Sequence, residues 1–303
     1  MNTLEVGSRT EAGIPSSAKV MRYAYGFDDV AIVPGSYTVN PELTDVSMKI
    51  GEHTFPIPIM AAALDAVVDQ NFARKFGRLG GLAVLNLEGI HTRYEDPAPL
   101  LEEITRTSKN DVTARLQKFY TEPIKPQLIA ERVRQMKADG VTAAVSCTPA
   151  NAKKFAPIAV EAGCDIFVCA STVTTARHIS TSFEGLRFER LCEDLSIPVV
   201  VGNTVGYAAT RELLETGVAA VLVGVGPGAI CTSREVLGIG VPQVSATIEC
   251  AAARNDYFRD TGRYVPIITD GGISKSGDLC KAIASGADGV MLGTLFAQTG
   301  YRA

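Results

Sequence analysis

The sequence has few residues that could bind zinc and no apolar segment long enough to cross a membrane. Its three histidines are widely separated, and none of its seven cysteines forms a CxxC pair, so a zinc site is not expected. The longest apolar stretch, Val218–Ile230, has 13 residues and is interrupted by glycines and a proline. A membrane-spanning helix needs about 20 residues. The polar N-terminus has no apolar signal core, so we expect a cytoplasmic protein without a membrane partner.

The chain also lacks a surplus of basic residues. It has 29 Lys and Arg against 33 Asp and Glu, which gives a net charge of −4. Proteins that bind nucleic acid duplexes normally carry a basic surplus, so nucleic acid is not an expected partner. With 46% hydrophobic and 20% charged residues, the composition excludes a collagen-like or largely disordered chain. Without a signal peptide a disulfide framework is not expected, and every cysteine except Cys231 is interpreted as a small buried apolar residue.

Eight short apolar runs recur along the chain and predict its strands. They are continuous rather than alternating, which is typical of parallel strands buried on both faces. Four of the distances between successive run starts are 22–24 residues, which suits a strand–loop–helix unit. The runs cover residues 58–62, 82–86, 142–146, 166–170, 198–202, 220–224, 266–270 and 289–293. Regular structure is expected to begin at Pro56–Met60.

Helical patterns lie between these runs. Residues 209–214 and 276–285 space their apolar residues three and four apart, and Gly217 and Gly286 follow as helix-ending glycines. Eight such units predict an α/β fold, a parallel eight-stranded (β/α)8 barrel. A doubly wound open sheet is the alternative, but no GxGxxG follows the first run. The last run ends near Gly293, ten residues before the end of the sequence, so a complete eighth helix is missing from the pattern.

The expected organisation is a flexible tail at residues 1–20 and one barrel domain at residues 21–303. The longest spacing, 60 residues, separates the second and third run starts. It holds a charged segment that we expect to form one or two helices with a solvated face. That length is too short for a second domain of about 100 residues.

Three glycine-rich loops follow the last three runs, at residues 224–233, 270–278 and 291–294. Barrel enzymes carry their chemistry at the C-terminal ends of the strands, and the loops after the last two strands commonly bind phosphate. Glycines let backbone N–H groups approach phosphate oxygens, although the same glycines can serve only as tight turns. Asp270 could accept hydrogen bonds from ribose hydroxyls or cap a helix. Cys231 could be a nucleophile of lowered pKa or a passive buried cysteine.

These loops carry a family resemblance. GVGPGAICTSREVLGIGVPQ at residues 224–243, DGGISKSGDLCKAIASGADGVMLGT at 270–294 and YGFDDVAIVPG at 25–35 resemble the IMP dehydrogenase/GMP reductase family over nearly the whole chain. The resemblance implies a (β/α)8 barrel that is usually a homotetramer. It also implies that Cys231 attacks C2 of a purine nucleotide, assisted by the hydroxyl of Ser233, and that Asp270 holds the ribose hydroxyls.

The resemblance implies further site residues. Asn203 falls where the family has an active-site asparagine, and Leu64 stands where the family stacks a methionine on the purine. The 5′-phosphate would be bound by Gly271, Gly272, Gly293 and Thr294. The cofactor would contact Ser171, Thr172 and Gly224. The carbonyls of Gly226, Gly228 and Cys231 match the family's monovalent-cation loop, which makes potassium a candidate ligand.

The chain also departs from the family pattern. Ala229 replaces a phosphate-binding serine, and Ala170 replaces the aspartate that binds the nicotinamide ribose, so the nicotinamide contacts are less well matched than the nucleotide contacts. The spacing after the second run is too short for the family's CBS modules. The mobile flap that follows the eighth strand in the family has no counterpart in this sequence.

Three functional hypotheses follow. The first is an NAD-dependent IMP dehydrogenase, which the segments around Cys231 and Asp270 favour. The second is a GMP reductase that uses NADPH. The absence of CBS modules and the segment SATIECAAA at residues 245–253 favour this second reading. The third is a barrel that binds purine nucleotides without catalysis, which Ala229, Ala170 and the short C-terminal segment suggest.

Overall fold

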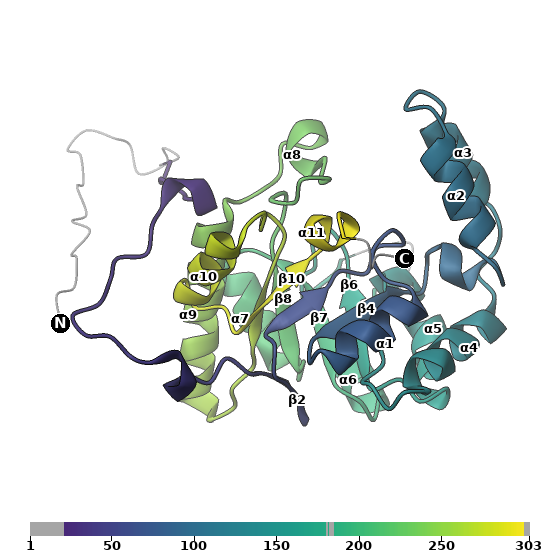
Figure 1. The fold of residues 1–303 in the computed structure, drawn as a ribbon. Coiled ribbons are helices and arrows are strands. Elements are labelled where there is room, and N and C mark those ends of the chain that lie inside the picture. Colours follow the sequence, from purple (N-terminus) through teal and green to yellow (C-terminus); the bar gives the residue numbers. More distant parts are fainter. Residues whose placement is uncertain (1–20, 180, 182–184, 300–303) are drawn as a thin grey trace.

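The computed structural model describes residues 21–179, 181 and 185–299, and these form a (β/α)8 barrel. Eight parallel strands close in the order β10-β3-β4-β5-β6-β7-β8-β9, with helices around them (Figure 1). The barrel strands are β3 (Ile59–Ala61), β4 (Leu82–Asn86), β5 (Ala144–Cys147), β6 (Ile166–Ala170), β7 (Val199–Thr204), β8 (Ala220–Val223), β9 (Ile267–Asp270) and β10 (Gly289–Leu292). The predicted fold class and all eight predicted strands are confirmed. The tail expected at residues 1–20 lies outside the described residues.

Helices follow most strands. The α-helices are α1 (Gln70–Arg78), α2 (Ala98–Arg106), α3 (Val112–Phe119), α4 (Pro126–Lys137), α5 (Pro149–Glu161), α6 (Phe188–Asp194), α7 (Tyr207–Glu215), α8 (Ser233–Val236), α9 (Gln243–Thr261), α10 (Ser276–Ala284) and α11 (Thr294–Ala297). Short 3-10 helices are η1 (Phe27–Asp29), η2 (Pro41–Leu43) and η3 (Ile90–Thr92). The helices predicted at residues 209–214 and 276–285 are α7 and α10. Among helices in the described part of the chain, none has the length and apolar composition of a membrane span.

Successive strand residues face opposite sides, and both sides are apolar. Leu82 and Val84 of β4 join a cluster of strand residues inside the barrel. Ala83 and Leu85 join the larger cluster that the strands form with the surrounding helices. Because both faces are buried, the strand appears in the sequence as a continuous apolar run.

A hairpin precedes the barrel and fills its interior from below. β1 (Met48–Ile50) and β2 (His53–Phe55) pair antiparallel, with Met48 opposite Phe55. Met48, Ile50 and Phe55 are buried in the same cluster as the inward-facing strand residues. The expectation that regular structure begins at Pro56–Met60 is therefore wrong, since three-residue strands are too short to show a sequence period.

The segment between β4 and β5 contains η3 and three helices, where we expected one or two. None of the residues of α2 is buried, and α2 and α3 extend beyond the barrel wall (Figure 1). α4 buries Leu128, Ile129 and Val133, and the last two belong to the cluster that the strands form with the surrounding helices. The solvated helix face is thus confirmed for α2, and no CBS module is evident in this segment.

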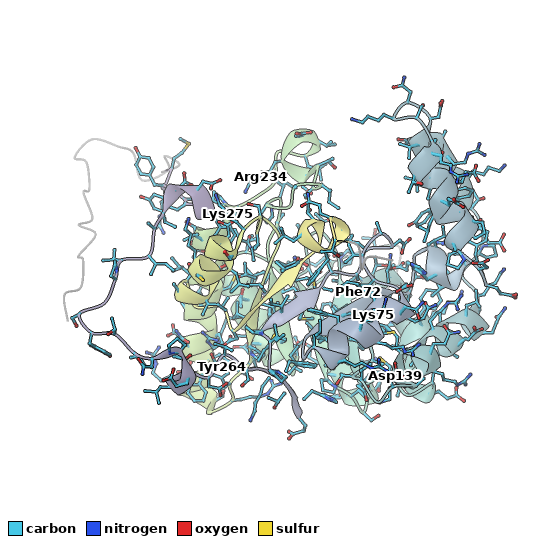
Figure 2. The ribbon with its side chains drawn as sticks, viewed as in Figure 1. Phe72, Lys75, Asp139, Arg234, Tyr264 and Lys275 are labelled. Carbon is cyan, nitrogen blue, oxygen red and sulfur yellow. The ribbon has the colours of Figure 1, made fainter. Side chains whose placement is uncertain are left out.

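After β10 the described chain continues as the short helix α11, where a full eighth helix would stand. The ring of Phe296 in α11 lies 5.4 Å from that of Phe72 and 4.9 Å from that of Phe76, both in α1. Figure 2 labels Phe72 in this layer, and it shows Tyr264 at the lower end of the barrel, opposite Arg234. This aromatic contact joins the end of the barrel to its first helix.

The seven cysteines are free, and their burial only partly follows the expectation. Cys147, Cys164, Cys169 and Cys250 are buried, whereas Cys192 is half-buried and Cys280 is exposed. Cys280 lies on the solvent side of α10, so its interpretation as a buried apolar residue is wrong. Cys231, the one cysteine set apart by its loop, is half-exposed.

Candidate active site

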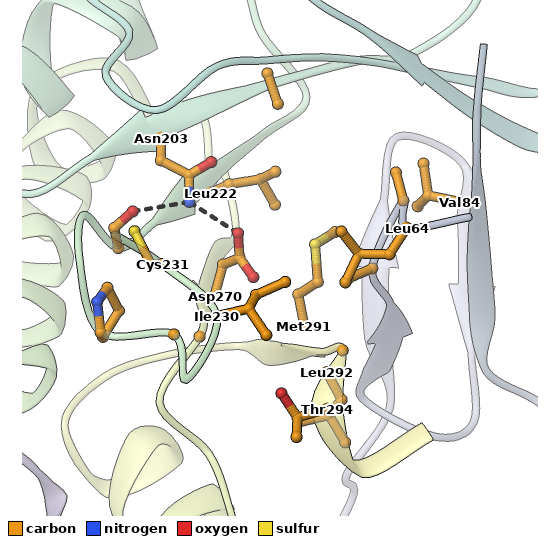
Figure 3. Close-up of a pocket in the computed structure, with 18 of the residues that line it drawn as sticks. Leu64, Val84, Asn203, Leu222, Ile230, Cys231, Asp270, Met291, Leu292 and Thr294 are labelled. Atoms are coloured by element: carbon orange, nitrogen blue, oxygen red, sulfur yellow. Dashed lines mark hydrogen bonds between the residues drawn. The ribbon is translucent and has the colours of Figure 1, made fainter. Parts of the chain in front are cut away.

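The C-terminal ends of all eight barrel strands surround a pocket of about 710 Å³. Figure 3 shows Asn203, Cys231 and Asp270 on one side of it, and Leu64, Val84 and Met291 on another. Among the residues predicted for the site, the pocket lining includes Leu64, Ser171, Thr172, Asn203, Gly224, Gly226, Gly228, Cys231, Asp270, Gly271, Gly272, Gly293 and Thr294. Ser233 is the one predicted site residue outside this lining. The fold therefore brings together side chains that are scattered over more than 200 positions of the sequence.

Asn203 links the ends of three strands at the pocket. It lies in β7, after a cis peptide bond with Gly202. Its side-chain Nδ2 donates to the carbonyl of Gly224 at 2.9 Å and to Oδ2 of Asp270 at 2.8 Å (Figure 3). One amide group thus holds the C-terminal ends of β7, β8 and β9 in fixed relative positions.

Asp270 ends β9 within this arrangement. Burial raises its pKa from 3.8 to about 6, and the hydrogen bond from Asn203 opposes that rise. Burial acts in this direction because it disfavours the charged carboxylate. The carboxylate is therefore ionised at neutral pH, when it can accept hydroxyl hydrogen bonds, and becomes protonated in mild acid.

Two glycines allow the strand ends to approach this closely. A Cβ at Gly224, whose φ is +150°, would lie 2.1 Å from the carbonyl oxygen of Asp270. Gly271 follows Asp270 with a φ of +91°, a conformation that glycine adopts without strain. This backbone conformation suits both a tight turn and a ligand-binding loop, so both alternatives stay open at Gly271.

The thiol of Cys231 lies on the loop after β8. Its Sγ forms a hydrogen bond with Oγ of Ser233 at 3.3 Å, and its N–H donates to the carbonyl of Gly228 at 3.0 Å. Hydrogen bonds from the hydroxyl and the N–H of Ser233 lower the pKa of Cys231, against a smaller opposing effect of burial. The N–H of Gly226 and the charge of Arg234 add to the lowering. Ser233 itself is buried behind the thiol, so it contacts the thiol and not the pocket.

The loops after β9 and β10 form the adjoining wall. Ser274, at the end of the first loop, donates to Oδ2 of Asp278 through both its N–H and its hydroxyl, each at 3.0 Å. Burial acts to raise the pKa of Asp278, but together these bonds and the N–H and charge of Lys275 lower it below its ordinary value. They fix the turn between Gly272 and α10. No basic side chain occurs in the described pocket lining, so phosphate binding would depend on backbone N–H groups.

The opposite wall comes from the ends of β4, β5 and β6. Ser171 and Thr172 lie there beside Ala170, and the hydroxyl of Ser171 donates to the carbonyl of Val173 at 2.9 Å. Sequence reasoning missed Glu88, which lines the same wall. Its only local signal was its position two residues after a predicted strand.

The comparisons with known proteins point to one family. Residues 24–301 match the sequence profile of the IMP dehydrogenase / GMP reductase domain. The chain is similar to a crystal structure of an IMP dehydrogenase/GMP reductase-like protein from Corynebacterium glutamicum, with a TM-score of 0.86 and 33% identity. That similarity covers 93% of this chain and 75% of the other.

The relatives include uncharacterized oxidoreductases and inosine-5′-monophosphate dehydrogenases. An uncharacterized oxidoreductase of Mycolicibacterium smegmatis is 37% identical over 283 residues, which are 91% of this chain and 76% of that protein. One from Mycobacterium tuberculosis H37Rv is 38% identical over 288 residues, with 93% and 77% covered. The inosine-5′-monophosphate dehydrogenase of Cryptosporidium parvum is 30% identical over 290 residues, with 90% and 68% covered.

Proposed function

The chain belongs to the IMP dehydrogenase/GMP reductase family, and on that premise we propose that it is an IMP dehydrogenase that oxidises IMP to XMP with NAD. The observation that carries this proposal is the pairing of a thiol of lowered pKa with a buried carboxylate in one pocket. Cys231 and Asp270 lie on neighbouring strand ends, and Asn203 bonds to the carboxylate. This arrangement supports a nucleophile beside a binding site for a ribose.

The thiolate of Cys231 would add to C2 of the purine and form a carbon–sulfur bond. NAD, when bound, would supply the acceptor for the hydride that leaves C2. Water next attacks C2, the carbon–sulfur bond breaks, and XMP is released with the thiolate restored. Overall, IMP, NAD and water give XMP, NADH and a proton. Covalent catalysis divides a difficult oxidation and hydrolysis into two easier steps.

The other pocket residues would hold the nucleotide. The carboxylate of Asp270 would accept hydrogen bonds from the ribose hydroxyls. Backbone N–H groups of the two loops after β9 and β10 would bind the 5′-phosphate. Leu64 lies beside Gly293, because a Cβ added to Gly293 would come 3.0 Å from Cδ1 of Leu64. The Leu64 side chain would contact the purine. The nucleotide-binding loop residues in this proposal are Gly271, Gly272, Gly293 and Thr294.

The cofactor and the cation are part of the same proposal. The dinucleotide would contact Ser171 and Thr172 beside the small side chain of Ala170 at the end of β6, and Gly224 at the end of β8, all of which line the pocket. The loop after β8 offers the carbonyls of Gly226, Gly228 and Cys231, and carbonyl oxygens are ligands that potassium takes. The carbonyl of Gly228 also accepts the N–H of Cys231. We further propose a cytoplasmic homotetramer.

The test is the absorbance of NADH in potassium buffer with IMP and NAD, using Cys231→Ala as the control. The proposal predicts NADH formation by the natural chain and none by the variant. Nucleotide binding with no NADH formation would contradict the proposal, and it would favour the non-catalytic barrel if GMP with NADPH also gave no reaction.

GMP reductase is the second candidate. The absence of an evident CBS module favours it, and so does the segment at residues 245–253 in α9. It would use the same thiol, with ammonia leaving GMP and NADPH supplying the hydride. Loss of NADPH absorbance with GMP, dependent on Cys231, would identify this activity instead.

A further inference from the structure

A second carboxylate faces the pocket from the wall opposite the reactive thiol. Glu88 and Asp270 are the two acidic residues in the described lining, and they come from different walls. Glu88 follows β4, which lies four strands from β8 in either direction around the barrel. β8 is the strand that precedes the loop of Cys231. Glu88 therefore belongs to the part of the pocket that the proposed nucleotide contacts do not use.

The neighbouring residues hold the Glu88 carboxylate in place. Oε2 accepts the N–H of Thr148 at 2.5 Å, and Oε1 accepts the Thr148 hydroxyl at 3.0 Å. The side-chain amide of Asn151 in α5 also donates to Oε1. An ionised carboxylate has about four acceptor positions, so three donors leave capacity for one more. Because Glu88 is only half-buried and lines the pocket, that capacity is open to a ligand.

The chemistry of this wall suits a sugar hydroxyl. The hydroxyl of Thr148 bonds to Glu88, and Ser146 and Ser171 add neutral hydroxyl groups to the same side of the pocket lining. The described lining has no basic side chain, so this wall offers no ion pair to a diphosphate. A carboxylate is the group that nucleotide-binding folds commonly use to accept a ribose hydroxyl.

We propose that Glu88 binds a ribose hydroxyl of the dinucleotide that takes the hydride, and so determines its affinity. The inference rests on the proposed function, in which the purine nucleotide occupies the Cys231 and Asp270 side. The ordered carboxylate then positions the dinucleotide across the pocket from the thiol. The alternative is that Glu88 only ties the loop after β4 to the start of α5.

Calorimetric titration of NAD into the Cys231→Ala chain saturated with IMP tests this inference, because turnover cannot occur. Adding Glu88→Gln is expected to weaken NAD binding about tenfold, since a hydrogen bond to a charged group is lost. The affinity for IMP should stay unchanged.

Asp165→Asn is the matched control. Asp165 accepts the N–H of Ala143 at 2.7 Å and pairs with Lys137, at the far end of the barrel from the pocket. Its substitution removes a comparable structural tie and is expected to leave NAD binding unchanged. Equal NAD affinity with and without Glu88→Gln, or an equal loss in the control, would overturn the inference.

NAD analogues give a second measurement, made by changing the ligand. NAD analogues that lack ribose hydroxyls should bind the Cys231→Ala chain more weakly than NAD, and at least one should be insensitive to Glu88→Gln. Failure of the proposed function looks different, because NAD binding would still depend on Glu88 while the natural chain formed no NADH. If every analogue is as sensitive to the substitution as NAD, the hydroxyl contact is wrong.

Discussion

At the scale of single residues, the ionisation of Asp270 links nucleotide binding to pH. Its raised pKa of about 6 means that the folded protein holds this proton more tightly than the unfolded chain, whose value is near 3.8. As pH rises between these two values, this group makes the fold less stable, because ionisation costs more in the buried site. The ionised form accepts hydrogen bonds from ribose hydroxyls more strongly than the protonated form does.

We predict that the affinity for IMP falls as pH is lowered from about 7 to about 5, with the change centred near the pKa of about 6. The measurement is the dissociation constant of IMP across this range by calorimetry. Asp270→Asn should bind IMP weakly at every pH and show no such transition. A transition that persists in this variant would assign the effect to another group.

The positions of Asp270 and Cys231 at and after the ends of predicted strands were enough to predict both as site residues. The contacts that set the pKa values of these two groups could not be predicted in this way. The bond from Asn203 to Asp270 joins residues 67 positions apart. Glu88 was missed for the same reason, since its partners Thr148 and Asn151 lie 60 and 63 positions away. Such contacts exist only after the barrel closes, and no local pattern records them.

At the scale of elements, the strands were predictable because each is buried on both faces and reads as an apolar run. The hairpin β1–β2 was not, because three residues cannot show a period and its burial depends on the open lower end of the barrel. The number of helices between β4 and β5 was underestimated, since α2 and α3 bury little and their charges dominate the pattern.

The close approach of β8 and β9 gives a prediction about Gly224. Gly224→Ala should destabilise the fold by about 2–3 kcal/mol and weaken IMP binding, because the new Cβ would push against the Asp270 carbonyl. Chemical denaturation measures the first effect and calorimetry the second.

Gly277 in α10 is the control for this substitution. A Cβ there would meet nothing within 4 Å, so Gly277→Ala should leave stability unchanged or raise it by up to about 1 kcal/mol. If the two variants are equally stable, the steric account of Gly224 is wrong.

At the scale of the whole molecule, an N-terminal arm at residues 31–46 is exposed along its length and stands away from the barrel (Figure 1). It is attached near η1, where Lys281 donates to the carbonyl of Phe27 at 2.7 Å. Beyond that point it exposes large apolar side chains, among them Val33 at 85% and Tyr37 at 81%. An apolar segment of this kind marks an interaction surface, which supports the proposed self-association.

We predict that the chain forms an oligomer through this arm, and that Val33→Glu combined with Tyr37→Glu shifts it toward the monomer. Light scattering coupled to size-exclusion chromatography measures the mass directly. Ile283→Glu is a suitable control, because it adds a charge at an exposed apolar position on α10. If the unsubstituted protein has the mass of a monomer, the prediction that the arm mediates self-association is wrong.

The most direct test of the central claim is the mass of the protein quenched in acid during reaction with IMP and NAD. The account predicts a purine nucleotide covalently attached to the peptide that carries Cys231, and no attachment when either ligand is left out or when Cys231→Ala is used. Rapid NADH formation with an adduct on another residue, or NADH formation that survives Cys231→Ala, would contradict it.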